Sequence, residues 1–178
     1  RGLGDVYKRQ EYFGRGPAEN YLDRNAGSMV GLYKSTAEEL YFPYVRPQEN
    51  GHHTDTRWVS LSTGKKGLLI QADNTIGFNA LRNSIEDFDD EEATGLPRQW
   101  SNFTPEQVAN HDEAAAKNVL RRQHHINNIT PRDFVEVCVD LKQQGVAGYD
   151  SWGSRPEPAY TLPANREYNW GFTLIPLK

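Results

Sequence analysis

The sequence is poor in cysteine, in basic charge and in long apolar runs. Its 178 residues include a single cysteine, Cys138, which excludes an internal disulfide and a cysteine-rich metal site. Twenty lysines and arginines against 24 aspartates and glutamates give a formal net charge of −4, so no basic surface for nucleic acid or an anionic membrane is expected. No apolar stretch approaches the length of a membrane span. We therefore expect neither a nucleic acid nor a membrane as a partner.

Aromatic side chains, by contrast, are abundant in an otherwise polar chain. Four Trp, nine Tyr and seven Phe make up 11% of the residues, while the mean hydropathy is −0.79. The length suffices for one domain with a sizeable core, or for part of a larger domain. We expect the core or a ligand-binding surface to be rich in rings.

The first ten residues differ in character from the rest. "DVYKRQ" (Asp5–Gln10) resembles the translated read-through of an adapter used in shotgun sequencing libraries, and the chain does not begin with Met. We expect residues 1–10 to be such read-through, or an upstream remnant, and the native domain sequence to run from Glu11 to Lys178.

Alternating polar and apolar residues predict short antiparallel strands. The segment Arg57–Ala72 predicts a hairpin, and Gly77–Asn83 a further short strand. The segments Asp133–Lys142 and Glu167–Pro176 alternate clearly enough to predict two longer half-buried strands. Thr104, Pro105 and Gln107 form a helix-start signal, which predicts a short helix over residues 105–120. Many strands, frequent turns and one helix favour an all-β antiparallel sandwich.

The segment "GYDSWGS" (Gly148–Ser154) places a large ring in what is otherwise a loop sequence. One interpretation is a sugar site, because an indole covers the apolar face of a pyranose while polar neighbours meet its hydroxyls. Gly148 and Gly153 would allow close approach of the ligand, and Asp150 and Ser151 could bind hydroxyls or cap the turn. The other interpretation is that Trp152 folds back as a lid over the core. The pattern alone favours neither.

Other candidate chemistry is weaker. His52, His53 and Asp55 could contribute to a metal site, but adjacent histidines point apart on a strand, so packing or surface roles are favoured. The same holds for Arg121–Ile126. Cys138 lies in the middle of a predicted strand and is expected to be structural. No motif identifies the pair of carboxylates that glycoside hydrolysis ordinarily needs.

Three ordered motifs carry a family resemblance. These are "YFGRGPAENYLDR" (Tyr12–Arg24), "PYVRPQENGHHTDTRWV" (Pro43–Val59) and "GVAGYDSWG" (Gly145–Gly153). In this order they resemble the large bacterial β-galactosidases of glycoside hydrolase family 2, and the likeness extends over nearly all of residues 11–178. It implies that these residues are the C-terminal portion of the last domain, the small-chain β-sandwich of the galactose-mutarotase-like (supersandwich) type. The stretch around residues 95–120 looks like an inserted helix.

The resemblance implies retaining hydrolysis of terminal β-D-galactosides such as lactose by the complete enzyme. In that family the two catalytic glutamates, and the ligands of an active-site Mg²⁺ and Na⁺, lie in a (β/α)8 barrel upstream of the matching region. We therefore expect no catalytic residue and no metal ligand here, and no activity from this chain alone. The implied partners are a galactoside substrate, the other domains of the same enzyme, and further copies in a homo-oligomer. Whether the enzyme is cytoplasmic or periplasmic stays open.

The resemblance also favours the sugar-binding interpretation of the loop. The residue matching Trp152 stacks on the sugar at the active-site rim, with Gly148, Tyr149, Asp150, Ser151 and Gly153 around it. Tyr149 is a departure, because the family commonly has a carboxylate there. The first two motifs are carried over as fold signatures and not as ligand contacts. The alternatives are a stand-alone carbohydrate-binding β-sandwich module and a purely structural piece with Trp152 buried.

Overall fold

The computed structural model describes residues 9–45, 47–63, 66–88, 126, 129–150 and 153–178. The chain divides into two compact units. The larger consists of residues 1–42, 50–82 and 133–178, and the smaller of residues 43–49 and 83–132. Residues 1–8 and the predicted helix at 105–120 lie outside the described part of the chain. In the described residues, no helix is both long and apolar enough to cross a membrane.

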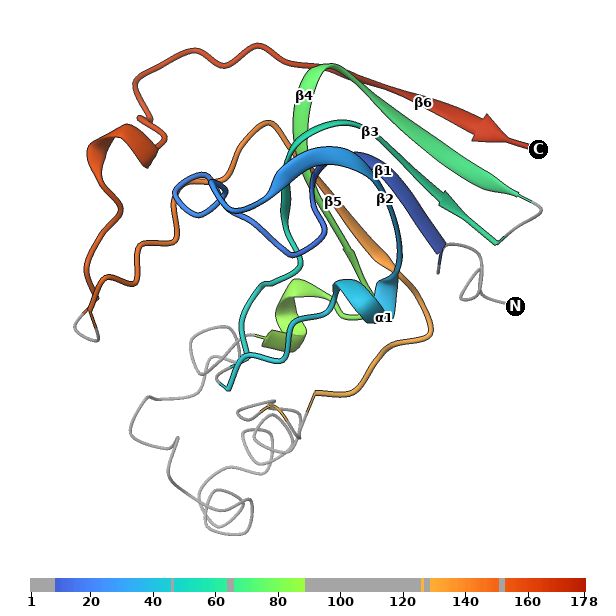
Figure 1. Cartoon of the computed structure of the whole chain (residues 1–178), viewed down its shortest axis with the longest axis horizontal. Helices are drawn as coiled ribbons and strands as arrows, with labels where there is room; N and C mark the ends of the chain where they lie inside the picture. The colour runs from blue at the N-terminus through green and yellow to red at the C-terminus, as the bar shows by residue number, and fades with distance from the viewer. Residues whose placement is uncertain (1–8, 46, 64–65, 89–125, 127–128, 151–152) are drawn as a thin grey trace, which may run out of the picture. The chain divides into compact units, whose positions relative to one another are not determined.

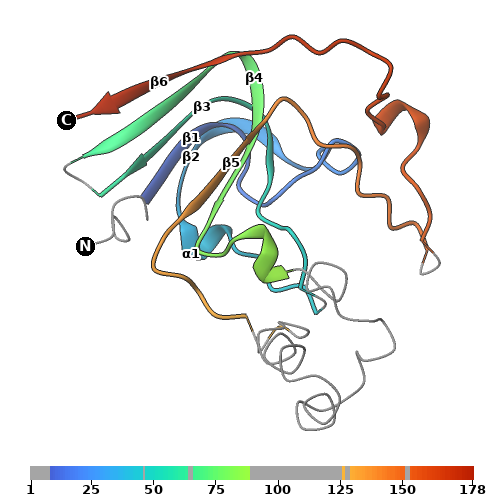
Figure 2. The same ribbon diagram turned by 180° about the vertical axis from the view of Figure 1, so that it is seen from behind.

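The larger unit is built on one antiparallel six-stranded sheet (Figure 1). Five strands follow the order β2-β1-β3-β4-β5, and β6 also pairs with β4. Figure 2 shows from the other side how β5 and β6 lie along different parts of β4. The strands are β1 (Arg9–Gly16), β2 (Met29–Thr36), β3 (His53–Ser62), β4 (Gly67–Leu81), β5 (Glu136–Asp140) and β6 (Phe172–Leu177).

One face of this sheet carries the core. Tyr12 on β1 lies opposite Val59 on β3, and Val59 lies opposite Ile70 on β4. All three side chains are almost completely buried. Because successive side chains of a strand point to opposite faces, this register places the alternate residues of each strand on the other side of the sheet.

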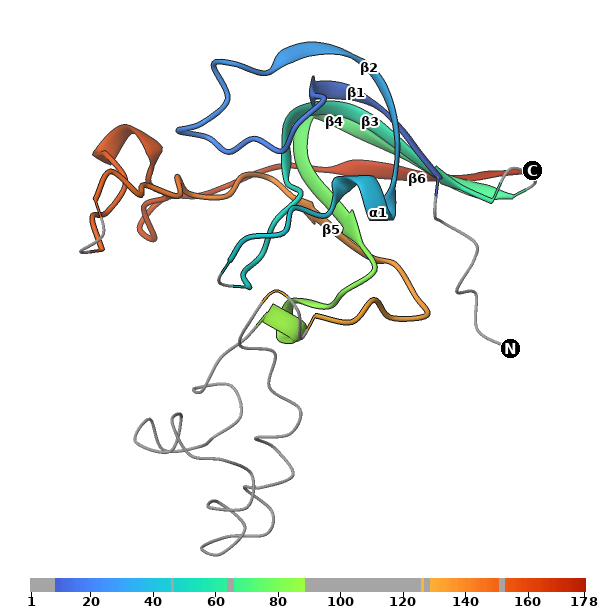
Figure 3. The same cartoon turned by 60° about the horizontal axis from the view of Figure 1, so that its bottom comes forward.

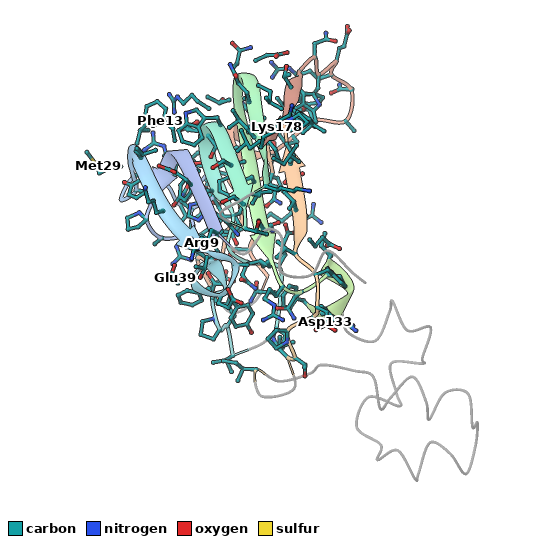
Figure 4. All side chains as sticks on the ribbon, turned by 90° about the vertical axis from the view of Figure 1, so that its right-hand side faces the viewer. Arg9, Phe13, Met29, Glu39, Asp133 and Lys178 are labelled. Atoms are coloured by element: carbon teal, nitrogen blue, oxygen red, sulfur yellow. The ribbon has the colours of Figure 1, made fainter. Side chains whose placement is uncertain are left out.

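The opposite face carries exposed apolar side chains among polar ones. Leu32 on β2 lies opposite Phe13 on β1, which in turn lies opposite Trp58 on β3. Trp58 lies opposite Gln71 on β4, and Leu69, two residues away on the same face of β4, lies opposite Ile175 on β6. Figure 4 shows Phe13 and Met29 on the β1–β2 side of the sheet, with Met29 projecting into open space. We call five apolar residues of this face, Leu32, Phe13, Trp58, Leu69 and Ile175, the outer stripe.

A single helical turn, α1 (Ala37–Leu40), follows β2 directly (Figure 3). It begins with a complete capping box. The Thr36 hydroxyl accepts a hydrogen bond from the backbone N–H of Glu39 at 3.2 Å, and the Glu39 carboxylate accepts one from the Thr36 N–H at 2.9 Å. Ala37 and Leu40 are buried.

The all-β antiparallel class predicted from the sequence is confirmed, as an open sheet of the kind that forms one layer of an incomplete sandwich. The predicted hairpin is confirmed in β3 and β4, which pair from Ser62 and Gly67 outward. The separate strand at Gly77–Asn83 is wrong, because β4 runs without a break to Leu81. It does so by exchanging β6 for β5 as its partner along its length.

The last two strands are shorter than predicted. β5 covers Glu136–Asp140 within the predicted segment 133–142. β6 begins at Phe172, so Tyr168 and Trp170 precede the strand instead of lying on its face. Here the Tyr168 hydroxyl donates to the carbonyl of Pro163 at 2.9 Å, so this side chain bonds within its own loop. Pairing with β4 begins only after the Gly171 carbonyl accepts from the Asp73 N–H at 3.1 Å.

The smaller unit contains a 3-10 turn at Ile85–Phe88. The Asp87 carboxylate accepts from the Ser84 N–H at 3.1 Å and pairs with two nitrogens of the Arg132 guanidinium. The Asn83 amide donates to the carbonyl of Thr130 at 3.1 Å. These contacts join the two ends of the segment between residues 83 and 132.

Candidate functional site: a loop anchored by Asp23

The predicted site residues lie in the loop that joins β5 to the 3-10 turn Pro158–Tyr160, the orange segment in Figure 1. Gly148, Tyr149, Asp150 and Gly153 are all exposed, and 60% of the Tyr149 surface is accessible. Ser151 and Trp152 lie outside the described residues, so the stacking role of Trp152 stays a prediction. The structure thus places the described members of the predicted site together on one exposed loop.

Hydrogen bonds fix the backbone of residues 145–147, which we call the root of the loop. Three consecutive backbone N–H groups each find an acceptor: Gly145 donates to the Tyr160 carbonyl at 2.7 Å, and the next two donate to the carboxylate of Asp23. The distances are 3.0 Å from the Val146 nitrogen to Oδ1 and 2.8 Å from the Ala147 nitrogen to Oδ2. A carboxylate that accepts two backbone N–H groups makes charge-assisted bonds, which are stronger than neutral ones.

Gly145 allows the carboxylate of Asp23 to lie close to the backbone of the loop. A Cβ atom at this position would lie 2.5 Å from Oδ2 of Asp23 and 3.0 Å from Cβ of Tyr160. Real Cβ atoms do not approach other atoms so closely, and hence any side chain at position 145 would displace Asp23 or Tyr160. The absence of a side chain at Gly145 is therefore a condition of the anchor.

Beyond the anchor the backbone changes direction. Ala147 has φ of 54° and Gly148 has φ of 85°, so two consecutive residues occupy the left-handed region. Further along the loop, Gly153 has φ of 85°, and the Asp150 carboxylate accepts from the Ser154 N–H at 3.3 Å. Of the two roles considered for Asp150, this contact supports turn capping.

The segment that carries Asp23 is itself held against the sheet. Tyr21 and Arg24 form an isolated antiparallel bridge, with the Arg24 N–H donating to the Tyr21 carbonyl at 2.9 Å. The buried Tyr21 ring stacks on His52, with ring centroids 5.6 Å apart. The N–H of Asn20 donates to the His52 carbonyl at 2.7 Å. Asp23 thus lies in a short turn fixed to the start of β3.

Asn20 connects this turn to the two central strands. Its side chain is fully buried. Its amide oxygen accepts from both the N–H and the hydroxyl of Thr54, at 2.9 and 2.6 Å. Its amide nitrogen donates to the carbonyls of Arg15 and Ala18, each at 3.1 Å. Such a satisfied buried amide gives the turn a single defined position.

An open hollow of about 400 Å³ lies beside the anchor. It is lined mostly by polar residues of the same turn, with the ring of Tyr160 among them. The lining residues are Glu19, Leu22, Asp23, Arg24, Asn25, Ala26, Gly27, Ser28 and Tyr160. The loop root and this hollow therefore share Asp23 and Tyr160.

The histidine pair is buried, as the packing interpretation predicted. The His53 ring lies between Tyr12 and Phe78, with centroids 4.7 and 5.4 Å away. Its Nδ1 lies 2.9 Å from the Arg15 carbonyl, which can only accept, so Nδ1 carries the proton. Nε2 of His53 then has no hydrogen-bond partner among the described residues.

Burial also keeps both rings neutral. Burial, together with the neighbouring His53, lowers the pKa of His52 to about 4. Burial lowers the pKa of His53 to about 4, against the opposing effects of the Arg15 carbonyl and the charge of Glu19. Oδ2 of Asp140 lies 4.0 Å from Nδ1 of His52, which is too far for a hydrogen bond.

The other candidates from the sequence were a metal site, Cys138 and the segment Arg121–Ile126. Within the described ranges, no group of three or more His, Cys, Asp or Glu side chains lies close enough together to hold a metal ion. Cys138 is half-buried in the middle of β5, where it lies opposite Asn79. In the segment Arg121–Ile126, Ile126 alone is described, and it is exposed.

Sequence reasoning missed the role of Asp23. The residue belongs to the first family motif, which was interpreted as a fold signature, and it lies more than 120 positions from the amides that it binds. A carboxylate inside a short polar turn gives no local sign of a distant partner. Its membership of the same motif set as the loop was the available signal.

Nearly the whole chain is similar to known proteins. The profile of the family described as beta galactosidase small chain matches residues 2–174. A beta-galactosidase from Priestia megaterium (strain DSM 319 / IMG 1521) is 35% identical over 167 residues, covering 93% of this chain and 13% of the relative. One from Streptococcus thermophilus is 28% identical over 177 residues, covering 98% of this chain and 14% of the relative. The chain thus spans about one seventh of the length of these curated relatives.

Proposed function

Because the chain belongs to the β-galactosidase small-chain family, we propose that it works as part of a β-galactosidase that hydrolyses terminal β-D-galactosides with retention. In this proposal the chain supplies the β-sheet and the loop at residues 145–153. The catalytic glutamates, and the ligands of Mg²⁺ and Na⁺, belong to a (β/α)8 barrel of the complete enzyme. The complete enzyme acts as a homo-oligomer.

The loop supplies an aromatic surface for the sugar at the rim of the active site. Trp152 stacks on the apolar face of the pyranose, and the neighbouring exposed residues Tyr149 and Asp150 lie beside its hydroxyls. The observation that supports this role is the combination of an exposed loop with a bonded root. A ring that must meet a substrate repeatedly in one geometry benefits from a fixed backbone, because less entropy is lost on binding.

The test is Trp152→Ala in the complete enzyme. Loss of a stacked ring weakens binding by about 1–3 kcal/mol, which corresponds to a rise of about 5- to 150-fold in KM for galactosides. We also expect a smaller fraction of galactosyl transfer to sugar acceptors. The measurement is steady-state kinetics with product analysis.

The chain offers a matched control in Trp170→Ala. Trp170 is also exposed, at 45%, but it precedes β6 and contacts Phe172, with ring centroids 5.5 Å apart. Its removal is expected to leave KM unchanged. Unchanged KM and unchanged transfer in Trp152→Ala would contradict the proposed role of the loop.

A further inference from the structure

Both oxygens of the Asp23 carboxylate bind the backbone of the loop. Each of its two oxygens accepts one backbone N–H of the loop, from Val146 and from Ala147. Oδ2 also faces the space that a Cβ atom of Gly145 would occupy. The carboxylate thus binds the backbone at Val146 and Ala147 and lies against the position of Gly145.

The direction of the tip is set at the residues that Asp23 holds. The left-handed turn begins at Ala147, whose N–H is the second donor to Asp23, and continues at Gly148. Beyond this point the loop has few close neighbours. No heavy atom of the described part of the chain lies within 4 Å of a Cβ position at either Gly148 or Gly153, and Tyr149 is exposed. With open space around these glycines, the direction in which the described residues 148–150 leave the sheet depends on the backbone at Val146 and Ala147.

We propose that Asp23 is a positioning residue for substrate binding: its carboxylate fixes the backbone at Val146 and Ala147 and thereby sets where the loop tip meets the sugar. This inference rests on the proposed function, since it requires the loop to contact substrate. Asp23 itself does not touch the substrate. Its effect on binding passes through the loop, and this distinguishes it from a residue that only stabilises the fold.

A double-mutant cycle in the complete enzyme tests the proposal. Asp23→Ala removes both acceptors, so KM for galactosides is expected to rise, by no more than in Trp152→Ala. In the Trp152→Ala background, Asp23→Ala is expected to change KM little further, because the ring that it positions is already absent. Asp23→Asn keeps one acceptor oxygen and is expected to fall between wild type and Asp23→Ala.

Hydrogen exchange gives a readout that does not depend on activity. The amides of Val146 and Ala147 are expected to exchange faster in Asp23→Ala than in the wild-type enzyme, because they lose their acceptors. Asp55→Asn is the matched control. It weakens the 2.5 Å contact between Arg15 and Asp55 near the same turn, and Asn tolerates the φ of 52° at this position. This variant is expected to leave both KM and the exchange of the two loop amides unchanged.

The outcomes separate the two ideas. If Trp152→Ala raises KM but Asp23→Ala does not, the positioning role is overturned and the proposed function stands. An equal KM increase from Asp23→Ala in both backgrounds also overturns it, because the effect would then bypass Trp152. If Trp152→Ala leaves both KM and galactosyl transfer unchanged, the proposed function of the loop fails, and the positioning role fails with it.

Discussion

The carboxylate of Asp23 accepts the backbone N–H of Ala147 at 2.8 Å, across 124 positions of sequence. The contact joins the turn before β2 to the loop after β5. Both residues belong to motifs that resemble the same family, and the structure gives a physical reason for their joint presence. The turn supplies the acceptor, and the loop supplies two donors in succession.

Two glycines of the loop are expected to respond differently to alanine. In Gly145→Ala the new Cβ would lie 2.5 Å from Oδ2 of Asp23, so the carboxylate must move. In Gly148→Ala the space is open, and the cost is the left-handed backbone, about 1–2 kcal/mol. We expect faster hydrogen exchange at Val146 and Ala147 in Gly145→Ala only. Equal exchange in the two variants would show that the close contact at Gly145 does not seat Asp23.

Asn20→Ala is expected to be one of the more destabilising substitutions in the turn. It leaves the part-buried N–H of Thr54 and the carbonyls of Arg15 and Ala18 without the partner that Asn20 provides. Each group left without a partner costs at most about 1–3 kcal/mol. The free energy of unfolding is therefore expected to fall by about 2–4 kcal/mol in Asn20→Ala. Thermal unfolding of the complete enzyme measures it. Asn25→Ala is the milder comparison, because Asn25 is half-buried and its amide donates to the Thr54 hydroxyl at a long 3.4 Å. An equal loss in both variants would contradict the central role of Asn20.

The buried histidines predict a loss of stability on acidification. Their pKa values are about 4 in the folded protein against 6.5 for an ordinary histidine. Between these two pH values the unfolded chain binds protons that the folded chain does not, so stability falls as the pH drops from 6.5 toward 4. The effect is on the order of a few kcal/mol at pH 4, and the two rings do not act independently, because His53 contributes to the lowered pKa of His52.

His53→Asn isolates this effect. The Asn amide can still donate to the Arg15 carbonyl that His53 contacts, but it does not titrate. We expect a lower Tm at pH 7, because ring packing is lost, and a shallower fall of Tm between pH 6.5 and 4.5 than in the wild type. Because the carboxylates contribute to both slopes, subtracting one slope from the other removes their contribution. Parallel slopes would refute the assignment to His53.

The outer stripe predicts self-association of this chain when it is expressed alone. Leu32 is 59% exposed, and Phe13 and Ile175 are also exposed, so this face of the sheet presents several apolar side chains to solvent. Exposed apolar groups of this kind on a sheet favour association. Size-exclusion chromatography and dye binding are expected to show aggregates or a loosely packed state.

Leu32→Lys tests which surface is responsible. A charge at this exposed position is expected to reduce association at little cost in stability. The control is Val45→Lys, since Val45 is 84% exposed and does not belong to the outer stripe. A wild-type chain that is monomeric and unfolds in one sharp thermal transition would contradict the prediction.

The sequence by itself determined the features that depend on near neighbours. Alternation of polar and apolar residues is local, so the hairpin of β3 and β4 and the antiparallel all-β class could be predicted from it. The three motifs were sufficient for the family resemblance. Gly148 and Gly153 marked the loop correctly, and both have positive φ.

The tertiary structure decided everything that depends on distant partners. β4 stays one strand because β6 and β5 succeed each other along it, and β6 begins at Phe172 because its pairing with β4 begins there. The burial of His53 depends on rings contributed by β1 and β4. Asp23 could not be assigned from its neighbours, because a hydrogen bond between residues this far apart in sequence exists only once the sheet has brought the turn and the loop together.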